Sequence, residues 1–165
     1  MPAKFIELKD ADLELLEAEL RTLCARAGAE AVVLADLSGV ILASHRVSEK
    51  IDSLLFAALL SSNFAATEEL SKRLGVTSFR IMYHEGKRQN LYFDKVADDT
   101  ILVVLFRDSN ALGRVRLFTE KSIVEISKMV SAATRPAGEA PILPQAQAAA
   151  AYLAQVAASI QPGKL

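Results

Sequence analysis

The sequence has only one cysteine, Cys24, and almost no excess charge of either sign across its 165 residues. A single cysteine excludes an internal disulfide bond, which fits a reducing compartment. The 19 basic side chains nearly balance the 20 acidic ones, so the net charge is −1. Nucleic acids and anionic membrane surfaces both require a concentrated positive field, so we expect neither as a partner.

Recognisable catalytic motifs are also missing. The two histidines, His45 and His84, fall in different parts of the pattern, and neither has a second metal ligand at helical or hairpin spacing. His84 and Glu85 could form an acid–base pair, but a polar end to a strand is the preferred interpretation. The glycines are isolated, so no phosphate-binding loop is predicted. We therefore predict no catalytic residue, no cofactor and no metal ion.

The start of the chain predicts no secretion signal. Lys4, Glu7 and Lys9 interrupt the first ten residues, so no apolar signal core fits there. We predict a cytoplasmic protein. Apolar residues make up 52% of the chain, and at this length folding can bury enough surface for one core.

The first half of the chain predicts a helix, a hairpin and a second helix. Leucines spaced by three and four indicate a helix over Asp10–Ala27. Two apolar runs, Ala31–Ala35 and Val40–Ala43, flank a turn that ends in glycine, which is typical of a β-hairpin. The second helix should run from about Asp52, a good N-cap, to about Leu74.

The middle of this second helix, Leu54–Thr67, contains no charged residue. A helix that is apolar or small around most of its circumference must be covered on both sides. Its own sheet can cover one side, and we expect another protein chain on the other. The alternative is a helix buried within one large domain, which suits a chain of this length less well.

The second half predicts three strands and a third helix. The strands are Ser78–Tyr83, Asn90–Val96 and Ile101–Phe106, and their short connections require antiparallel pairing. The last strand is apolar on both faces and should be central. A third helix should follow Asp108 and end before Arg135. The predicted fold is α/β (α+β), with helices on a five-stranded antiparallel sheet and the order α-β-β-α-β-β-β-α.

The C-terminal part differs in composition from the rest. We predict a domain over residues 1–134, a linker containing proline and glycine over 135–144, and an alanine-rich tail helix over 145–165. The three glutamines and the weakly apolar alanines of Gln145–Ile160 argue against a membrane span. A tail helix that docks on a partner, or back on its own domain, is the better interpretation.

Three segments resemble a known family. Leu60–Thr67 has a pattern of small residues, asparagine and paired alanines. Tyr83–Gly86, with Leu91–Tyr92 downstream, resembles a hairpin signature, and Leu112–Leu117 resembles the start of a last helix. These patterns resemble the roadblock superfamily, named after a dynein light chain, and within it the bacterial MglB branch. The similarity spans roughly Leu13 to Val130.

The resemblance implies a homodimer that binds a small Ras-like GTPase of MglA type, with two chains per GTPase. Such a protein would be a GTPase-activating protein in bacterial cell polarity or motility, concentrated at a cell pole. It would act by remodelling the GTP-bound state, without an inserted arginine. Spacing selects no such residue among the arginines that are candidates for exposure, which are Arg46, Arg73, Arg88, Arg107 and Arg114.

Other functions remain open at this stage. A roadblock scaffold would assemble a complex without changing hydrolysis. A small-molecule sensor would need a roomy pocket with convergent polar groups. An enzyme whose catalytic residues are not recognised is the last alternative.

The resemblance also places the interacting residues. In the family, the paired second helices form much of the dimer and meet the GTPase, and a tail helix contacts a separate site on it. In this sequence the first surface would comprise Leu59, Ser62, Ala65, Ala66 and Glu69. The tail contact would comprise Tyr152, Leu153 and Val156. Glu68 and Glu69 depart from the family pattern, in which small or apolar residues are common.

Overall fold

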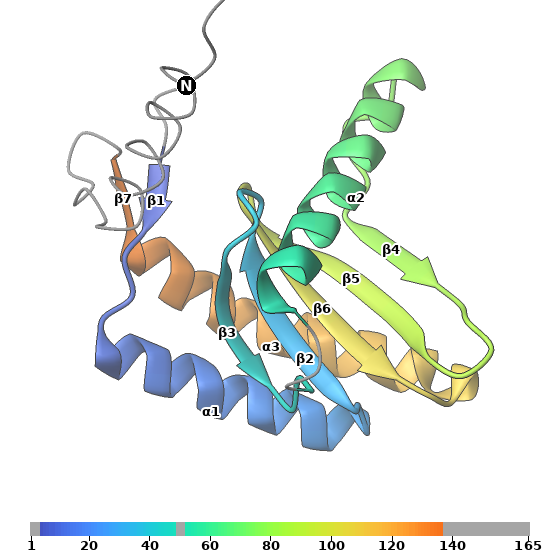
Figure 1. Ribbon diagram of the computed structural model, residues 1–165, viewed down its shortest axis with the longest axis horizontal. Helices are drawn as coiled ribbons and strands as arrows, with labels where there is room; N and C mark the ends of the chain where they lie inside the picture. Colours follow the sequence, from blue (N-terminus) through green and yellow to red (C-terminus); the bar gives the residue numbers. More distant parts are fainter. Residues whose placement is uncertain (1–3, 49–51, 137–165) are drawn as a thin grey trace, which may run out of the picture. The chain divides into compact units, whose positions relative to one another are not determined.

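The computed structural model describes residues 4–48 and 52–136, and its main unit runs from Ile6 to Thr134 (Figure 1). This unit is built on one five-stranded sheet with the strand order β3-β2-β6-β5-β4, in which all neighbours are antiparallel. The strands are β2 (Ala31–Asp36), β3 (Ile41–His45), β4 (Ile81–His84), β5 (Asn90–Ala97) and β6 (Thr100–Phe106).

Helices cover both faces of the sheet. α1 (Asp10–Ala27) and α3 (Leu112–Ala133) lie on one face, and α2 (Ser53–Arg73) crosses the other alone (Figure 1). The predicted fold class and element order are therefore confirmed, except that the predicted tail helix lies outside the described residues.

The central strand connects two apolar clusters. β6 lies in the middle of the sheet, as its apolar sequence predicted. Because successive side chains of a strand point to opposite faces, Leu102 and Val104 pack towards α1 and α3, whereas Ile101 and Val103 pack towards α2. All four side chains are fully buried.

The helix ends follow from local chemistry. α1 has the predicted bounds, and Gly28 closes it with a φ of 67°. At the start of α2, the Asp52 carboxylate accepts a hydrogen bond from the backbone N–H of Leu55 at 3.0 Å, which confirms the predicted cap. Gly75, shortly after the end of α2, has a φ of 69°, a left-handed conformation that glycine adopts without strain.

Several boundaries differ from the sequence prediction. β4 begins at Ile81, not Ser78, and β3 spans Ile41–His45, not Val40–Ala43. A 3-10 turn, η1 (Ser109–Ala111), precedes α3, and the side chain of Asp108 caps this turn. Two short strands, β1 (Lys4–Ile6) and β7 (Thr134–Pro136), form a separate sheet that was not predicted, because three residues give too little periodic signal.

The remaining C-terminal part, residues 137–165, lies outside the described residues. The predicted boundaries at 134, 144 and 145 therefore stay predictions, although β7 includes the first two residues of the expected linker. In the two described stretches, no helix is long and apolar enough to cross a membrane.

Candidate partner-binding surface

One face of α2 packs on the sheet. Ala57, Leu60 and Phe64 are buried there, and Leu60 and Phe64 join the apolar cluster of Val33, Phe93 and Val103. The hydroxyl of Ser61 donates a hydrogen bond to the carbonyl of Leu37 in the β2–β3 turn. These contacts fix which side of the helix points away from the sheet.

The opposite side of α2, continued by Leu74 directly after its last residue, exposes a row of large apolar side chains. Leu55, Leu59, Leu70 and Leu74 have exposed fractions of 58%, 59%, 53% and 61%. Spacings of three and four residues place Ser62 and Ala66 between these leucines on the same side. We call the set the α2 stripe; it comprises Leu55, Leu59, Ser62, Ala66, Leu70 and Leu74.

The residues predicted for the partner surface all lie on the side of α2 that is exposed in the single chain. Leu59, Ser62 and Ala66 belong to the stripe, and Ala65 and Glu69 flank it. Glu69 forms ion pairs with Arg73 at 3.1 Å and Lys72 at 3.9 Å on the same helix. The predicted tail residues Tyr152, Leu153 and Val156 lie outside the described residues.

Three stripe leucines were not predicted as site residues. Leu55, Leu70 and Leu74 extend the exposed row at both ends. The helical spacing from Leu59 could have found them, but the sequence did not show which side of the helix faced the sheet. Once Leu60 and Phe64 are known to be buried, the spacing leaves these leucines pointing outward.

The two glutamates that depart from the family pattern have different environments. Glu68 points towards the sheet, where its Oε1 lies 2.8 Å from Nζ of Lys95 on β5. Glu69 lies on the outer side and pairs within α2. Glu68 thus belongs to the packing of α2 on its own sheet, and Glu69 to the candidate surface.

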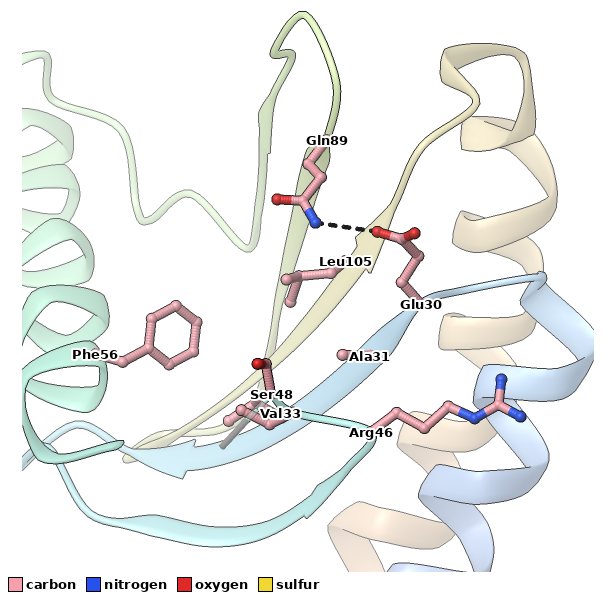
Figure 2. Close-up of a pocket in the computed structure, with 9 residues that line it drawn as sticks. Glu30, Ala31, Val33, Arg46, Ser48, Phe56, Gln89 and Leu105 are labelled. Carbon is pink, nitrogen blue, oxygen red and sulfur yellow. Dashed lines mark hydrogen bonds between the residues drawn. The ribbon is translucent and has the colours of Figure 1, made fainter. Parts of the chain in front are cut away.

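A small pocket lies on the α2 side of the sheet. Its volume is about 150 Å³, and Phe56 of α2 faces Val33 and Leu105 of the sheet across it (Figure 2). At the rim, the side-chain amide of Gln89 donates a hydrogen bond to Glu30 at 3.1 Å. Small-molecule sites usually exceed about 300 Å³, so this pocket gives the sensor hypothesis no support.

The single cysteine is engaged in a structural contact. The Cys24 thiol is buried and donates a hydrogen bond to the Ala29 carbonyl at 3.2 Å, and burial raises the pKa of this thiol. Among residues 4–48 and 52–136, no cluster of three or more histidine, cysteine or acidic side chains could hold a metal ion.

The candidate arginines do not converge on one point. Nε of Arg114 donates a hydrogen bond to the carbonyl of Ala27 at 2.9 Å, and Arg107 pairs with Glu30. Arg46 extends away from Phe56 (Figure 2), and Arg88 lies exposed in the β4–β5 connection. Arg73 is adjacent to the α2 stripe, where it is paired with Glu69.

Comparisons with known proteins identify this architecture. The profile of the Roadblock/LC7 domain family matches residues 15–106. No match was found among curated proteins. The chain belongs to the Roadblock/LC7 domain family.

Within that family the chain is MglB-like. Myxococcus xanthus MglB is 32% identical, with a TM-score of 0.68 over 72% of this chain and 96% of that chain. The gliding protein MglB from Thermus thermophilus is 27% identical, with a TM-score of 0.71 over 81% and 99%. A structure described as MglB with a tetrameric arrangement is 28% identical, with a TM-score of 0.72 over 81% and 98%.

Proposed function

We propose that this chain is a homodimeric GTPase-activating protein for a small Ras-like GTPase of MglA type, with two chains binding one GTPase. The observation that carries the proposal is the α2 stripe, a row of exposed leucines on a chain that is 32% identical to Myxococcus xanthus MglB. Large exposed apolar patches usually mark interaction sites, because water contact with them is unfavourable.

The stripe suits both self-association and GTPase binding. Ser62, Ala65 and Ala66 are small, so the backbone of a second helix can approach α2 closely at its centre. The leucines at either end would then be buried against the partner, and each fully buried leucine side chain contributes about 2 kcal/mol. The relative described as MglB with a tetrameric arrangement supports self-association.

The activating mechanism that we propose is the one that the resemblance to MglB implies, and the stripe itself carries only leucine, serine and alanine side chains. Arg73, the arginine adjacent to it, is engaged by Glu69. In this mechanism the chain accelerates hydrolysis by binding the GTP-bound shape of its partner and repositioning that partner's own catalytic residues. The difference between the binding free energies of the chain for the two shapes of the GTPase limits how far binding can shift the GTPase towards the GTP-bound shape. The protein would act in the cytoplasm and would be concentrated at a cell pole.

Single-turnover GTP hydrolysis by the MglA-type GTPase of the same organism tests the proposal. We expect the wild-type chain to accelerate the reaction by about tenfold or more, equivalent to at least about 1.4 kcal/mol of barrier. Ala65→Arg should abolish the acceleration, because a guanidinium placed in a close-packed contact lacks room and a counter-charge. The control Val124→Arg changes an exposed residue of α3, on the other face of the sheet, and should retain the acceleration.

The outcomes separate the candidate functions. GTPase binding without acceleration would leave a roadblock scaffold, and binding to neither nucleotide state would overturn the MglB-like function. Acceleration that Ala65→Arg leaves intact would remove the assignment of the site to α2. Replacing each of the five candidate arginines by alanine then tests whether the chain supplies one to the GTPase.

The tail contributes a second contact in this proposal. Tyr152, Leu153 and Val156 would bind a separate site on the GTPase. Leu153→Asp should weaken GTPase binding while leaving self-association through α2 unchanged. Equal binding by the wild type and this variant, measured by titration calorimetry, would exclude the tail contact.

A further inference from the structure

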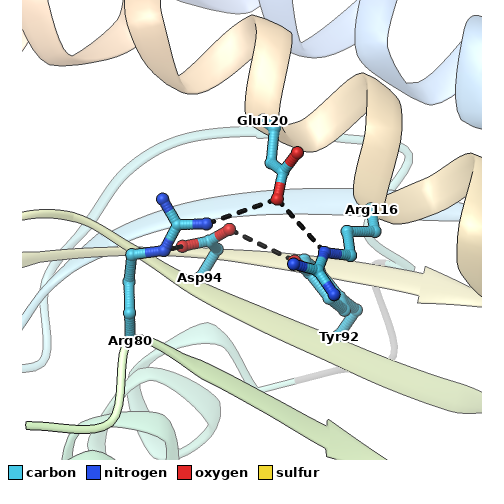
Figure 3. Close-up of polar contacts among 5 residues, drawn as sticks. All are labelled: Arg80, Tyr92, Asp94, Arg116 and Glu120. Atoms are coloured by element: carbon cyan, nitrogen blue, oxygen red, sulfur yellow. Dashed lines mark hydrogen bonds and ion pairs between the residues drawn. The ribbon is translucent and has the colours of Figure 1, made fainter.

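A fully buried carboxylate lies between the sheet and α3. The side chain of Asp94 on β5 has an exposed fraction of 0% and points to the same face as Tyr92 (Figure 3). The Tyr92 hydroxyl donates a hydrogen bond to Oδ2 of Asp94 at 3.2 Å, and Nε of Arg80 lies 3.3 Å from Oδ1. Leaving a buried carboxylate without its cation is strongly unfavourable, so the position of Arg80 matters.

Arg80 bridges this carboxylate to the surface of α3. Its Nη2 lies 3.5 Å from Oε1 of Glu120, which also lies 3.1 Å from Nε of Arg116 (Figure 3). The charged and titratable groups around Asp94 are therefore Tyr92 from β5, Arg80 from the α2–β4 connection, and Arg116 and Glu120 from α3. Asp94 and Tyr92 are the members of this group that are withdrawn from water, and Asp94 is the one that carries a charge.

Arg80 is also where the connection after α2 reaches the sheet. The N–H groups of Gly75 and Val76 still bond back to carbonyls of α2, at 3.1 Å and 3.0 Å. At Arg80 the carbonyl accepts a hydrogen bond from the backbone N–H of Lys95 at 3.0 Å. Arg80 thus holds the connection to β5 with both its main chain and its side chain.

The next residue of β5 holds the body of α2. Lys95 points to the opposite face from Asp94, where its Nζ lies 2.8 Å from Oε1 of Glu68 and 5.8 Å from the centre of the Phe64 ring. Two consecutive residues of one strand therefore anchor α2 and the segment that leaves it. Of the two attachments, the Glu68–Lys95 pair lies on α2 itself, and the Arg80–Asp94 pair lies on the α3 face of the sheet.

We propose that Asp94 and Arg80 are positioning residues that hold the connection between α2 and β4 on β5, and that this attachment loosens in mildly acidic solution. Burial raises the pKa of the Asp94 carboxyl to about 6, although Arg80 opposes the shift. Between pH 7 and pH 5 the carboxylate takes up a proton and its attraction for Arg80 is lost.

Hydrogen exchange of the full chain, measured by mass spectrometry between pH 5 and pH 7.5, tests the attachment without any partner. After correction for the pH dependence of chemical exchange, we expect protection of residues 71–80 to fall by about tenfold or more on acidification. Asp94→Asn should be weakly protected at every pH and show no step. The control Glu125→Gln removes an exposed carboxylate of α3 and should retain the step.

A second variant keeps the test valid if Asp94→Asn does not fold. Arg80 is half exposed, so Arg80→Gln should fold, and loss of the cation should raise the Asp94 pKa by about one unit or more in a carbon-13 titration. Protection of residues 71–80 that is independent of pH, or an unchanged Asp94 pKa in Arg80→Gln, would overturn the inference. Neither result depends on the GTPase, so both leave the proposed function standing.

Discussion

The two faces of the sheet are covered to very different extents. On one face, α1 and α3 together bury an apolar layer in which Leu16, Leu20 and Leu23 are fully inaccessible. On the other face, α2 lies alone and keeps Leu55, Leu59 and Leu70 more than half exposed. The first layer is complete within one chain, whereas the outer side of α2 is left exposed. Stability and recognition should therefore respond to different substitutions.

The largest expected effect belongs to the complete layer. Leu20→Ala should lower the free energy of unfolding by about 3 kcal/mol, because it removes a fully buried side chain and leaves a cavity. Urea denaturation of the variant and the wild type at equal concentration measures the difference. A loss below about 1 kcal/mol would mean that the α1–α3 layer is less closely packed than its burial indicates.

The charge within the complete layer gives a pH dependence. Because the Asp94 pKa is about 6 in the folded chain and ordinarily 3.8, the folded state binds more protons between these values. The contribution of Asp94 to stability should therefore rise as the pH falls, by about 2 kcal/mol between pH 7 and pH 4. Subtracting the unfolding free energy of Asp94→Asn from that of the wild type at each pH isolates this contribution. A difference that does not change with pH would refute the prediction.

The α2 stripe should affect association more than folding. Leu59→Glu should weaken self-association by about tenfold or more, since it places a charge in an apolar contact, while the folded monomer is retained. Leu117→Glu is the matched control, because Leu117 is an exposed leucine of α3 with an exposed fraction of 49%. Sedimentation of both variants over a range of concentrations decides the comparison. Equal weakening by the two variants would show that α2 has no special role.

The smallest effect concerns the start of α2. Asp52→Ala should destabilise the fold by about 1 kcal/mol, because the backbone N–H of Leu55 loses its acceptor. Asp52→Asn should be nearly neutral, since asparagine caps helices equally well. Thermal unfolding by circular dichroism gives both values. A variant Asp52→Ala that is as stable as the wild type would show that the cap is dispensable.

Local signals predicted much of this fold. The bounds of α1 were predicted because its leucine spacing ends at Gly28, a residue suited to a left-handed helix end. β6 was correctly placed in the centre because it is apolar on both faces. Periodicity and end signals are properties of neighbouring residues, so they can be read without the tertiary structure.

Features that depend on distant residues could not be predicted. The start of β4 was misplaced because Arg80, expected within the strand, instead reaches Asp94 and Glu120 elsewhere in the chain. The lack of charge in α2 indicated a covered helix, but not that Leu60 faces the sheet while Leu59 faces outward. The contact of Glu68 with Lys95 likewise joins residues that no local pattern connects.

The opposite charges of Asp94 and Lys95 also constrain how the strands align during folding. Side chains alternate between faces along a strand, so a slip of one residue in β5 would exchange the faces of these two groups. Asp94 would then approach Glu68, and Lys95 would approach Arg80 and Arg116, placing like charges together in both layers. The pair thus disfavours hairpin alignments shifted by one residue relative to the observed one.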